Sequence, residues 1–82
     1  MWTTAAALLG FVFNNSDALI AAGKSVAGLI SEVIGMITGA SKAGRTDLTR
    51  DEFNAFVDKA LGNSADLDKI IADLKAEIAA NP

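Results

Sequence analysis

Small residues recur at every fourth position in the middle of the chain, and this spacing constrains the fold more than any other feature of the sequence. The residues are Gly23, Ala27, Ser31, Gly35 and Gly39. On an α-helix, a four-residue spacing places all of them on one slowly drifting stripe. A stripe without bulky side chains allows a second helix to approach almost to backbone contact. We therefore expect this segment to pack closely against another helix.

The chain is short for an independently stable fold. Ordering its 82 residues costs on the order of 120 kcal/mol, and a small domain buries barely enough apolar surface to offset this cost. The sequence contains no Cys and no His, so it has neither disulfides nor the common zinc sites as extra sources of stability. We therefore expect oligomerisation or burial in a membrane to stabilise it.

Charge divides the chain into an apolar half and a charged half. Residues 1–40 contain only Asp17, Lys24 and Glu32, whereas the other fourteen charged side chains follow residue 40. We expect residues 1–40 to be an apolar helical segment that contacts an assembly or a membrane. Residues 41–46 are then a flexible linker, and residues 47–82 an amphipathic αα-hairpin.

Two apolar runs make up the N-terminal half. The first extends from Ala5 to Phe13 and follows Thr3 and Thr4, which can cap a helix. The second covers residues 17–39 and is apolar around most of its circumference, as is typical of a buried helix. The polar residues 14–17 between them leave open whether residues 3–39 form one helix or two.

The C-terminal half carries clear helix signals. Thr49 and Glu52 have the spacing of a capping box, and Gly62 stands where a helix-ending glycine is expected. A last helix follows, capped by Asn63 or Ser64, and its apolar residues recur at helical spacing. We expect the apolar faces of these two helices to cover one another, so that the apolar surface of residues 5–39 is left uncovered. The predicted fold is all-α: a long or broken apolar N-terminal helix followed by an amphipathic helical hairpin.

Several function classes lack their usual residues. Without His or Cys, and without a nucleophile motif, the chain does not offer the groups of nucleophilic catalysis. The acidic pairs 51–52 and 66–68 lie in first helical turns, where carboxylates stabilise free N–H groups. Basic residues are scattered and the net charge is −3, unlike the basic face of a nucleic-acid-binding protein. We expect no enzyme activity, cofactor, metal, small-molecule substrate or nucleic-acid partner.

Five further residues are candidates for contacts with a partner. Lys24 and Glu32 lie on one narrow face of an otherwise apolar segment, where they can pair between neighbouring copies. Trp2, Phe11 and Phe13 can anchor the N-terminus at an interface or at a membrane surface, or they can be buried in the fold. The small-residue stripe has the same two interpretations, because a crossing of two helices within one chain also uses Gly and Ala.

These observations favour a protein whose function is association. We expect a non-enzymatic structural subunit that forms a homo-oligomer or ring through the stripe, and a small component of a viral or phage virion is a natural setting for it. The first alternative is a membrane-active protein of the holin or pore-forming kind, with residues 5–37 in lipid. The second is a soluble adaptor or inhibitor that binds one partner protein. The copy number, the partner and the location, in a virion or at a membrane, stay open.

Overall fold

Helices form all the regular structure in residues 1–62 and 65–80, which are the residues that the computed structural model of this chain describes. The expected all-α class is therefore confirmed for this part of the chain. The elements are α1 (Thr3–Asn14), α2 (Ser16–Ala21), α3 (Val26–Lys42), α4 (Arg50–Phe56), the π-helical turn η1 (Val57–Leu61) and α5 (Asp68–Ala80).

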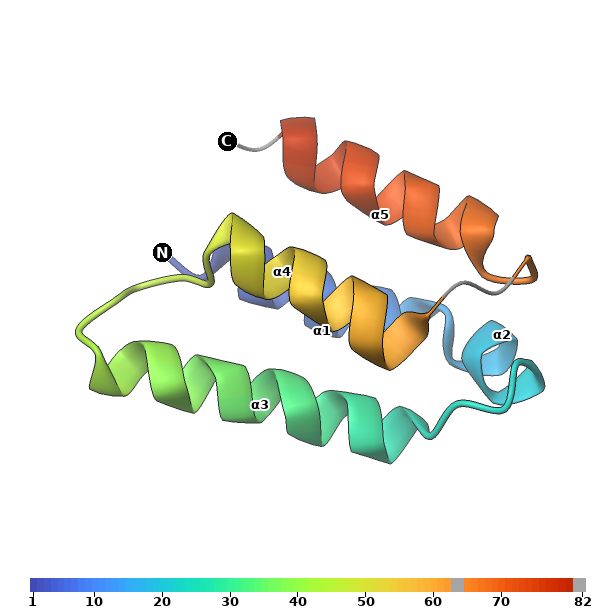
Figure 1. Cartoon of the computed structure of the whole chain (residues 1–82), viewed down its shortest axis with the longest axis horizontal. Helices are drawn as coiled ribbons and strands as arrows, with labels where there is room; N and C mark the ends of the chain where they lie inside the picture. The colour runs from blue at the N-terminus through green and yellow to red at the C-terminus, as the bar shows by residue number, and fades with distance from the viewer. Residues whose placement is uncertain (63–64, 81–82) are drawn as a thin grey trace.

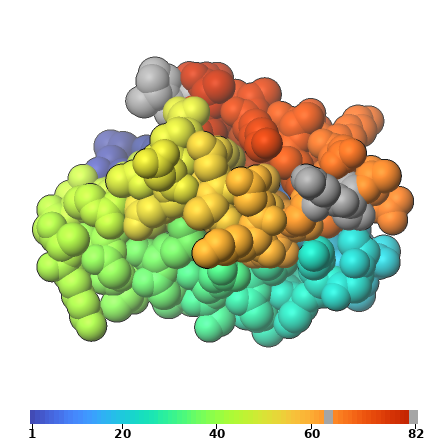
Figure 2. Space-filling model, in the orientation of Figure 1, coloured from blue at the N-terminus to red at the C-terminus, as the bar shows by residue number. Residues whose placement is uncertain are grey.

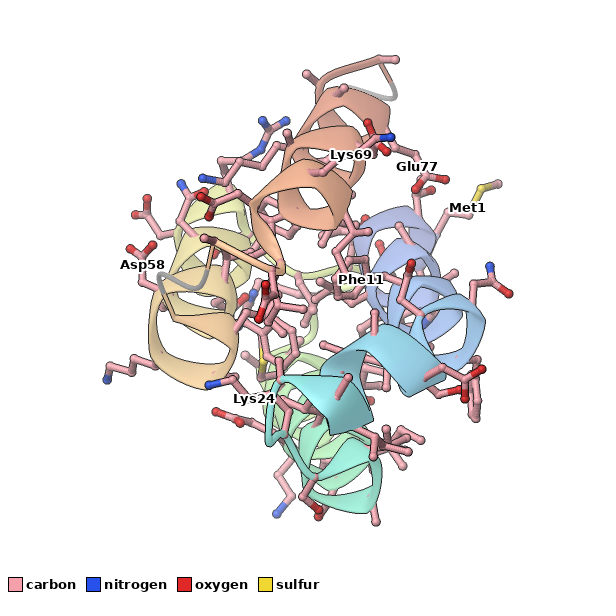
Figure 3. The ribbon with its side chains drawn as sticks, turned by 90° about the vertical axis from the view of Figure 1, so that its right-hand side faces the viewer. Met1, Phe11, Lys24, Asp58, Lys69 and Glu77 are labelled. Atoms are coloured by element: carbon pink, nitrogen blue, oxygen red, sulfur yellow. The ribbon has the colours of Figure 1, made fainter. Side chains whose placement is uncertain are left out.

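The long elements form an up-down-up-down four-helix bundle (Figure 1). α1 and α4 with η1 run in one direction, and α3 and α5 run in the opposite direction. Seen end-on in Figure 3, α5, α1, α3 and α4 occupy the four corners, and α2 bridges α1 and α3. Such an arrangement lets every helix bury one apolar face in a shared core.

The N-terminal half contains three helices rather than one long apolar helix. The first break is at Asn15, whose side-chain amide and backbone N–H both donate hydrogen bonds to the carbonyl of Phe11, at 2.9 and 3.0 Å. The second break follows α2. These breaks let α1 and α3 fold back on each other, which a continuous helix over residues 3–39 could not do.

Gly23 ends α2 and is not part of the helical stripe, contrary to the sequence-based prediction. Its φ is +82°, a left-handed conformation that glycine adopts without strain. The N–H of Gly23 donates to Ile20 and the N–H of Lys24 donates to Leu19, both at 2.9 Å. This pair of bonds is a Schellman motif, so the helical stripe begins only at Ala27.

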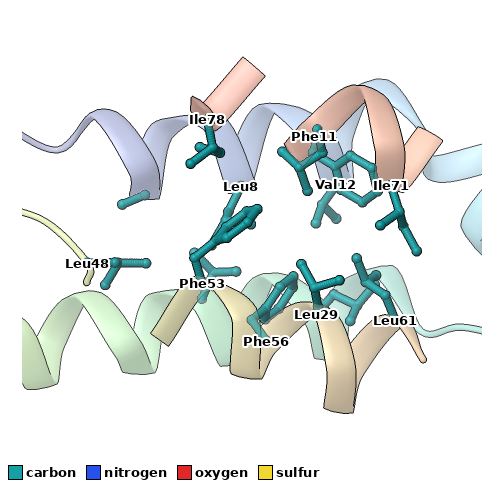
Figure 4. Packing of buried hydrophobic residues seen from close by; sticks show 14 of the residues in the cluster. Leu8, Phe11, Val12, Leu29, Leu48, Phe53, Phe56, Leu61, Ile71 and Ile78 are labelled. Carbon is teal, nitrogen blue, oxygen red and sulfur yellow. The ribbon is translucent and has the colours of Figure 1, made fainter. Parts of the chain in front are cut away.

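The two C-terminal helices cover the N-terminal half rather than only each other, so much of the apolar surface of residues 5–39 that was expected to be uncovered is buried. Residues of all the helices join in one buried cluster, and Figure 4 shows Phe53 and Phe56 of α4 beside Leu8 of α1 and Leu29 of α3. The exposed surface is 4809 Å² for 8.4 kDa, close to the ~4600 Å² of an ordinary folded monomer of that mass. The single chain therefore covers its own core.

The capping box of α4 is confirmed. The Glu52 N–H donates to the Thr49 hydroxyl at 3.1 Å, and the Thr49 N–H donates to the Glu52 carboxylate at 2.8 Å. Gly62, with φ +67°, ends η1 as the sequence predicts for the end of this helix. The predicted cap at Asn63 or Ser64 lies outside the described residues.

The predicted cap of α1 is wrong. Neither Thr3 nor Thr4 caps α1, because the N-cap is Trp2 and it makes no side-chain cap hydrogen bond. The Asp47 carboxylate takes this role from the loop between α3 and α4. It accepts hydrogen bonds from the backbone N–H groups of Thr4, at 3.0 and 3.1 Å, and of Ala5, at 3.2 Å.

Candidate interaction surface

The outer side of α3 carries the part of the small-residue stripe that is helical. Ala27, Ser31, Gly35 and Gly39 are all exposed, whereas Leu29, Val33 and Ala40 on the inner side are buried. A Cβ atom added at Gly35 or Gly39 would meet no atom within 4 Å. No helix of this chain therefore lies against these positions, and the stripe is not used in packing within the chain. In Figure 2, α3 forms the lower border of the molecule.

Large apolar side chains are also exposed on the three N-terminal helices. Phe13 of α1 is 61% exposed, Ile20 of α2 is 61% exposed, and Ile34 of α3 is 51% exposed. The three helices contact one another. Phe13 lies about 200° around α1 from Phe11, which faces α5, so Phe13 points away from α5. We call the exposed stripe of α3 together with Phe13, Ile20 and Ile34 the α1–α3 surface.

Charge is sparse on the α1–α3 surface. α1 has no charged residue, α2 has only Asp17, and α3 has only Glu32 and Lys42. The twelve charged residues after residue 45 belong mainly to the α4 and α5 side of the bundle. A partner can therefore cover the α1–α3 surface without desolvating many ionic groups.

Lys24 and Glu32 do not pair within the described part of the chain, where the one ion pair joins Arg45 to Glu52. Lys24 lies in the turn before α3 and is half-buried, whereas Glu32 is exposed on α3. The Lys24 ammonium lies 3.8 Å from the position that a Cβ of Gly62 would occupy, and Figure 3 shows it beside the end of η1. A positive charge at the end of a helix is stabilised by the exposed carbonyl groups there.

Of the three predicted anchors, only Phe13 is on the surface. Phe11 is 6% exposed and belongs to the core, and Trp2 is half-buried against it. Phe11 and Phe13 point to opposite sides because two residues of a helix are separated by about 200°. Sequence reasoning had no basis for choosing between them before the positions of α3 and α5 were known.

Ile20 and Ile34 are exposed apolar residues that sequence reasoning did not single out. Both belong to apolar stretches whose residues look alike in the sequence. Their exposure follows from how α1, α2 and α3 pack against one another. No local pattern in the sequence separates them from the buried apolar residues beside them.

The described residues show no group of three or more His, Cys, Asp or Glu side chains that could hold a metal ion. Among the helices in residues 1–62 and 65–80, none has the length and hydropathy needed to cross a membrane.

No protein-family model, no curated protein and no solved structure matches this chain.

Proposed function

We propose that this protein is a non-enzymatic structural subunit that assembles with copies of itself through the α1–α3 surface. One observation carries the proposal: Gly35 and Gly39 lie inside a 17-residue helix, are exposed, and meet nothing in their own chain. A glycine inside a helix destabilises it by about 1 kcal/mol relative to alanine. The folded monomer gains no stability from these two glycines. A second helix, in contrast, can approach closely where they lie, because they have no side chain.

The charge distribution permits a second copy as the partner at this surface. Each copy carries a net charge of −3, so two copies repel one another over most of their surfaces. The α1–α3 surface carries few charged residues, so a contact made through it adds little to this repulsion. A standard interface takes about 800 Å² from each partner, roughly one-sixth of the 4809 Å² exposed here. One side of a molecule of this size is sufficient for such a contact.

The mass of the purified protein in solution, without detergent, tests this proposal. We expect light scattering on a sizing column to show a discrete multimer, and Gly35→Leu to reduce its mass towards that of the monomer. Ala55→Leu is the matched control, because it adds a similar side chain at an exposed position of α4. It should leave the mass unchanged. Circular dichroism should show the same helix content for all three proteins.

Other results would contradict the proposal. A wild-type monomer at about 100 μM would favour the adaptor, since the bundle covers its own core and can bind a different protein as a monomer. Recovery only in detergent would favour the membrane-active alternative, with Phe13 and Ile20 as the side chains that enter lipid. A Gly35→Leu multimer of unchanged mass and stability would show that close packing at the stripe does not hold the copies together.

A further inference from the structure

A cleft of about 230 Å³ lies between α1 and α5. In the end-on view of Figure 3, α1 and α5 meet on one side of the bundle, near Phe11 and Glu77, whereas α3 occupies another corner. The cleft is therefore separate from the outer side of α3. It is also smaller than the ~300–1000 Å³ of typical small-molecule sites, and its size suits a single side chain.

The walls of the cleft combine an apolar base with acidic groups. Phe11 and Leu74 lie at its base, and both are buried in the core. Asp73 and Glu77 of α5 line it one helical turn apart, so they lie on the same side of that helix. A side chain with an apolar stem and a cationic head matches this combination, and lysine and arginine have that form.

The α1 wall of the cleft is itself made of small residues. Ala6 and Gly10 are four residues apart, and a Cβ added at Gly10 would meet nothing within 4 Å. This spacing repeats that of Gly35 and Gly39 on α3. Two such stripes allow two helices to approach closely.

We infer that the cleft receives Lys42 of a second copy, whose α3 stripe lies against α1. This inference rests on the proposed self-assembly and adds the partner surface to it. Lys42 is exposed in the last turn of α3, three residues after Gly39 and on the same side of the helix. The side chains of Lys42 and Asp73 form no hydrogen bond or ion pair with another residue in the described part of the chain.

The two surfaces that meet are different parts of the molecule. α3 of one copy contacts α1 and α5 of the next, which is a head-to-tail interface. Such interfaces build rings when the rotation closes and open filaments when it does not. A two-fold pair of α3 helices would instead use one surface twice.

Mixing two variants tests this arrangement. Lys42→Ala keeps the cleft and loses the lysine, whereas Asp73→Ala keeps the lysine and loses an acid of the cleft. We expect each variant alone to assemble about tenfold more weakly than the wild type. An equimolar mixture should form 1:1 heterodimers, because the Asp73→Ala copy places its Lys42 in the intact cleft of the other. Isotope labelling of one variant and native mass spectrometry identify the heterodimer.

The control and a second variant keep the outcome decisive. Lys59→Ala is the control. It removes an exposed charge on η1, an element outside α1, α3 and α5, and this variant should assemble like the wild type. Gly10→Leu fills the cleft from the α1 side and should weaken assembly as Asp73→Ala does. Unchanged assembly of Asp73→Ala and Gly10→Leu, or no heterodimer on mixing, overturns the inference. If Gly35→Leu still dissociates the wild-type multimer in that case, the proposed function stands without it. A wild-type monomer overturns both.

Discussion

A single carboxylate, that of Asp47, organises the start of α1. Besides the N–H groups of Thr4 and Ala5, it accepts a hydrogen bond from the N–H of Leu48 at 2.8 Å. Burial alone raises the pKa of Asp47, but these backbone N–H groups together lower the pKa below its usual range. The charged carboxylate is thus stabilised by the positive end of α1, and it joins α1 to the loop before α4.

We expect Asp47→Ala to lower the free energy of unfolding by about 1–2 kcal/mol, because two N–H groups of α1 lose their acceptor. Asp47→Asn should have a smaller effect, since one acceptor oxygen is retained. Urea denaturation at pH 7 measures both. Asp58→Ala, at an exposed position of η1, is the control and should stay within about 0.5 kcal/mol of the wild type. Equal losses for the alanine variants at 47 and 58 would show that the cap contributes nothing.

The helix α3 contains one kind of glycine and is followed by another. Gly35 lies within the helix, whereas Gly44 follows its end with φ +77°. Gly44 completes a Schellman motif in which its N–H donates to Ser41 at 3.0 Å and the N–H of Arg45 donates to Ala40 at 2.9 Å. A Cβ added at either glycine would meet nothing within 4 Å. The two positions therefore differ in backbone conformation and not in available space.

Alanine should have opposite effects at these two positions. Gly35→Ala should stabilise the monomer by about 0.5–1 kcal/mol, because alanine favours the helix. Gly44→Ala should destabilise it by about 1 kcal/mol or more, because a side chain disfavours positive φ. Thermal unfolding at concentrations below assembly measures both changes. A loss of stability in Gly35→Ala would mean that Gly35 supports the fold of its own chain, contrary to the role proposed for it.

For the whole molecule, we expect sensitivity to acid to depend on two carboxylates. Asp47 lies in the loop before α4, and Glu52 lies in the first turn of α4. Arg45 donates hydrogen bonds to both Glu52 oxygens, at 2.5 and 3.1 Å. With the Thr49 N–H, it lowers the pKa of Glu52 to about 2. Glu52 and Asp47 both have lower pKa values in the folded chain than when unfolded. Their contribution to the free energy of unfolding is therefore complete at a pH above their pKa values in the unfolded chain, which are about 4. It is lost as the pH falls through their pKa values in the folded chain.

We expect the free energy of unfolding to change little between pH 5 and pH 8, where the chain has no His to titrate, and to fall between pH 4 and pH 2. Urea denaturation across this range measures the profile. Glu52→Gln should be less stable than the wild type at pH 7 and should show a shallower decrease in acid. If the decrease is as steep in the variant as in the wild type, Glu52 does not contribute to the acid sensitivity.

Local signals in the sequence determined part of this structure. The capping box of Thr49 and Glu52 is predicted correctly because both partners lie within one helical turn. The all-α class follows from helical periodicity over the whole chain, and the stripe from Ala27 to Gly39 from its four-residue spacing. Each of these depends on residues close together in the chain, whose geometry the helix alone defines.

Only the tertiary structure decided which faces of these helices are covered. Asp47 caps a helix more than 40 residues away, so no local pattern indicates it. Gly23 fits both the stripe and a helix end, and the packing of α2 against α3 selects the end. Phe11 is buried and Phe13 exposed because α5 lies on one side of α1. The physical reason is the same in each case: burial depends on neighbours that are distant in the chain, and local periodicity describes a helix without saying what lies beside it.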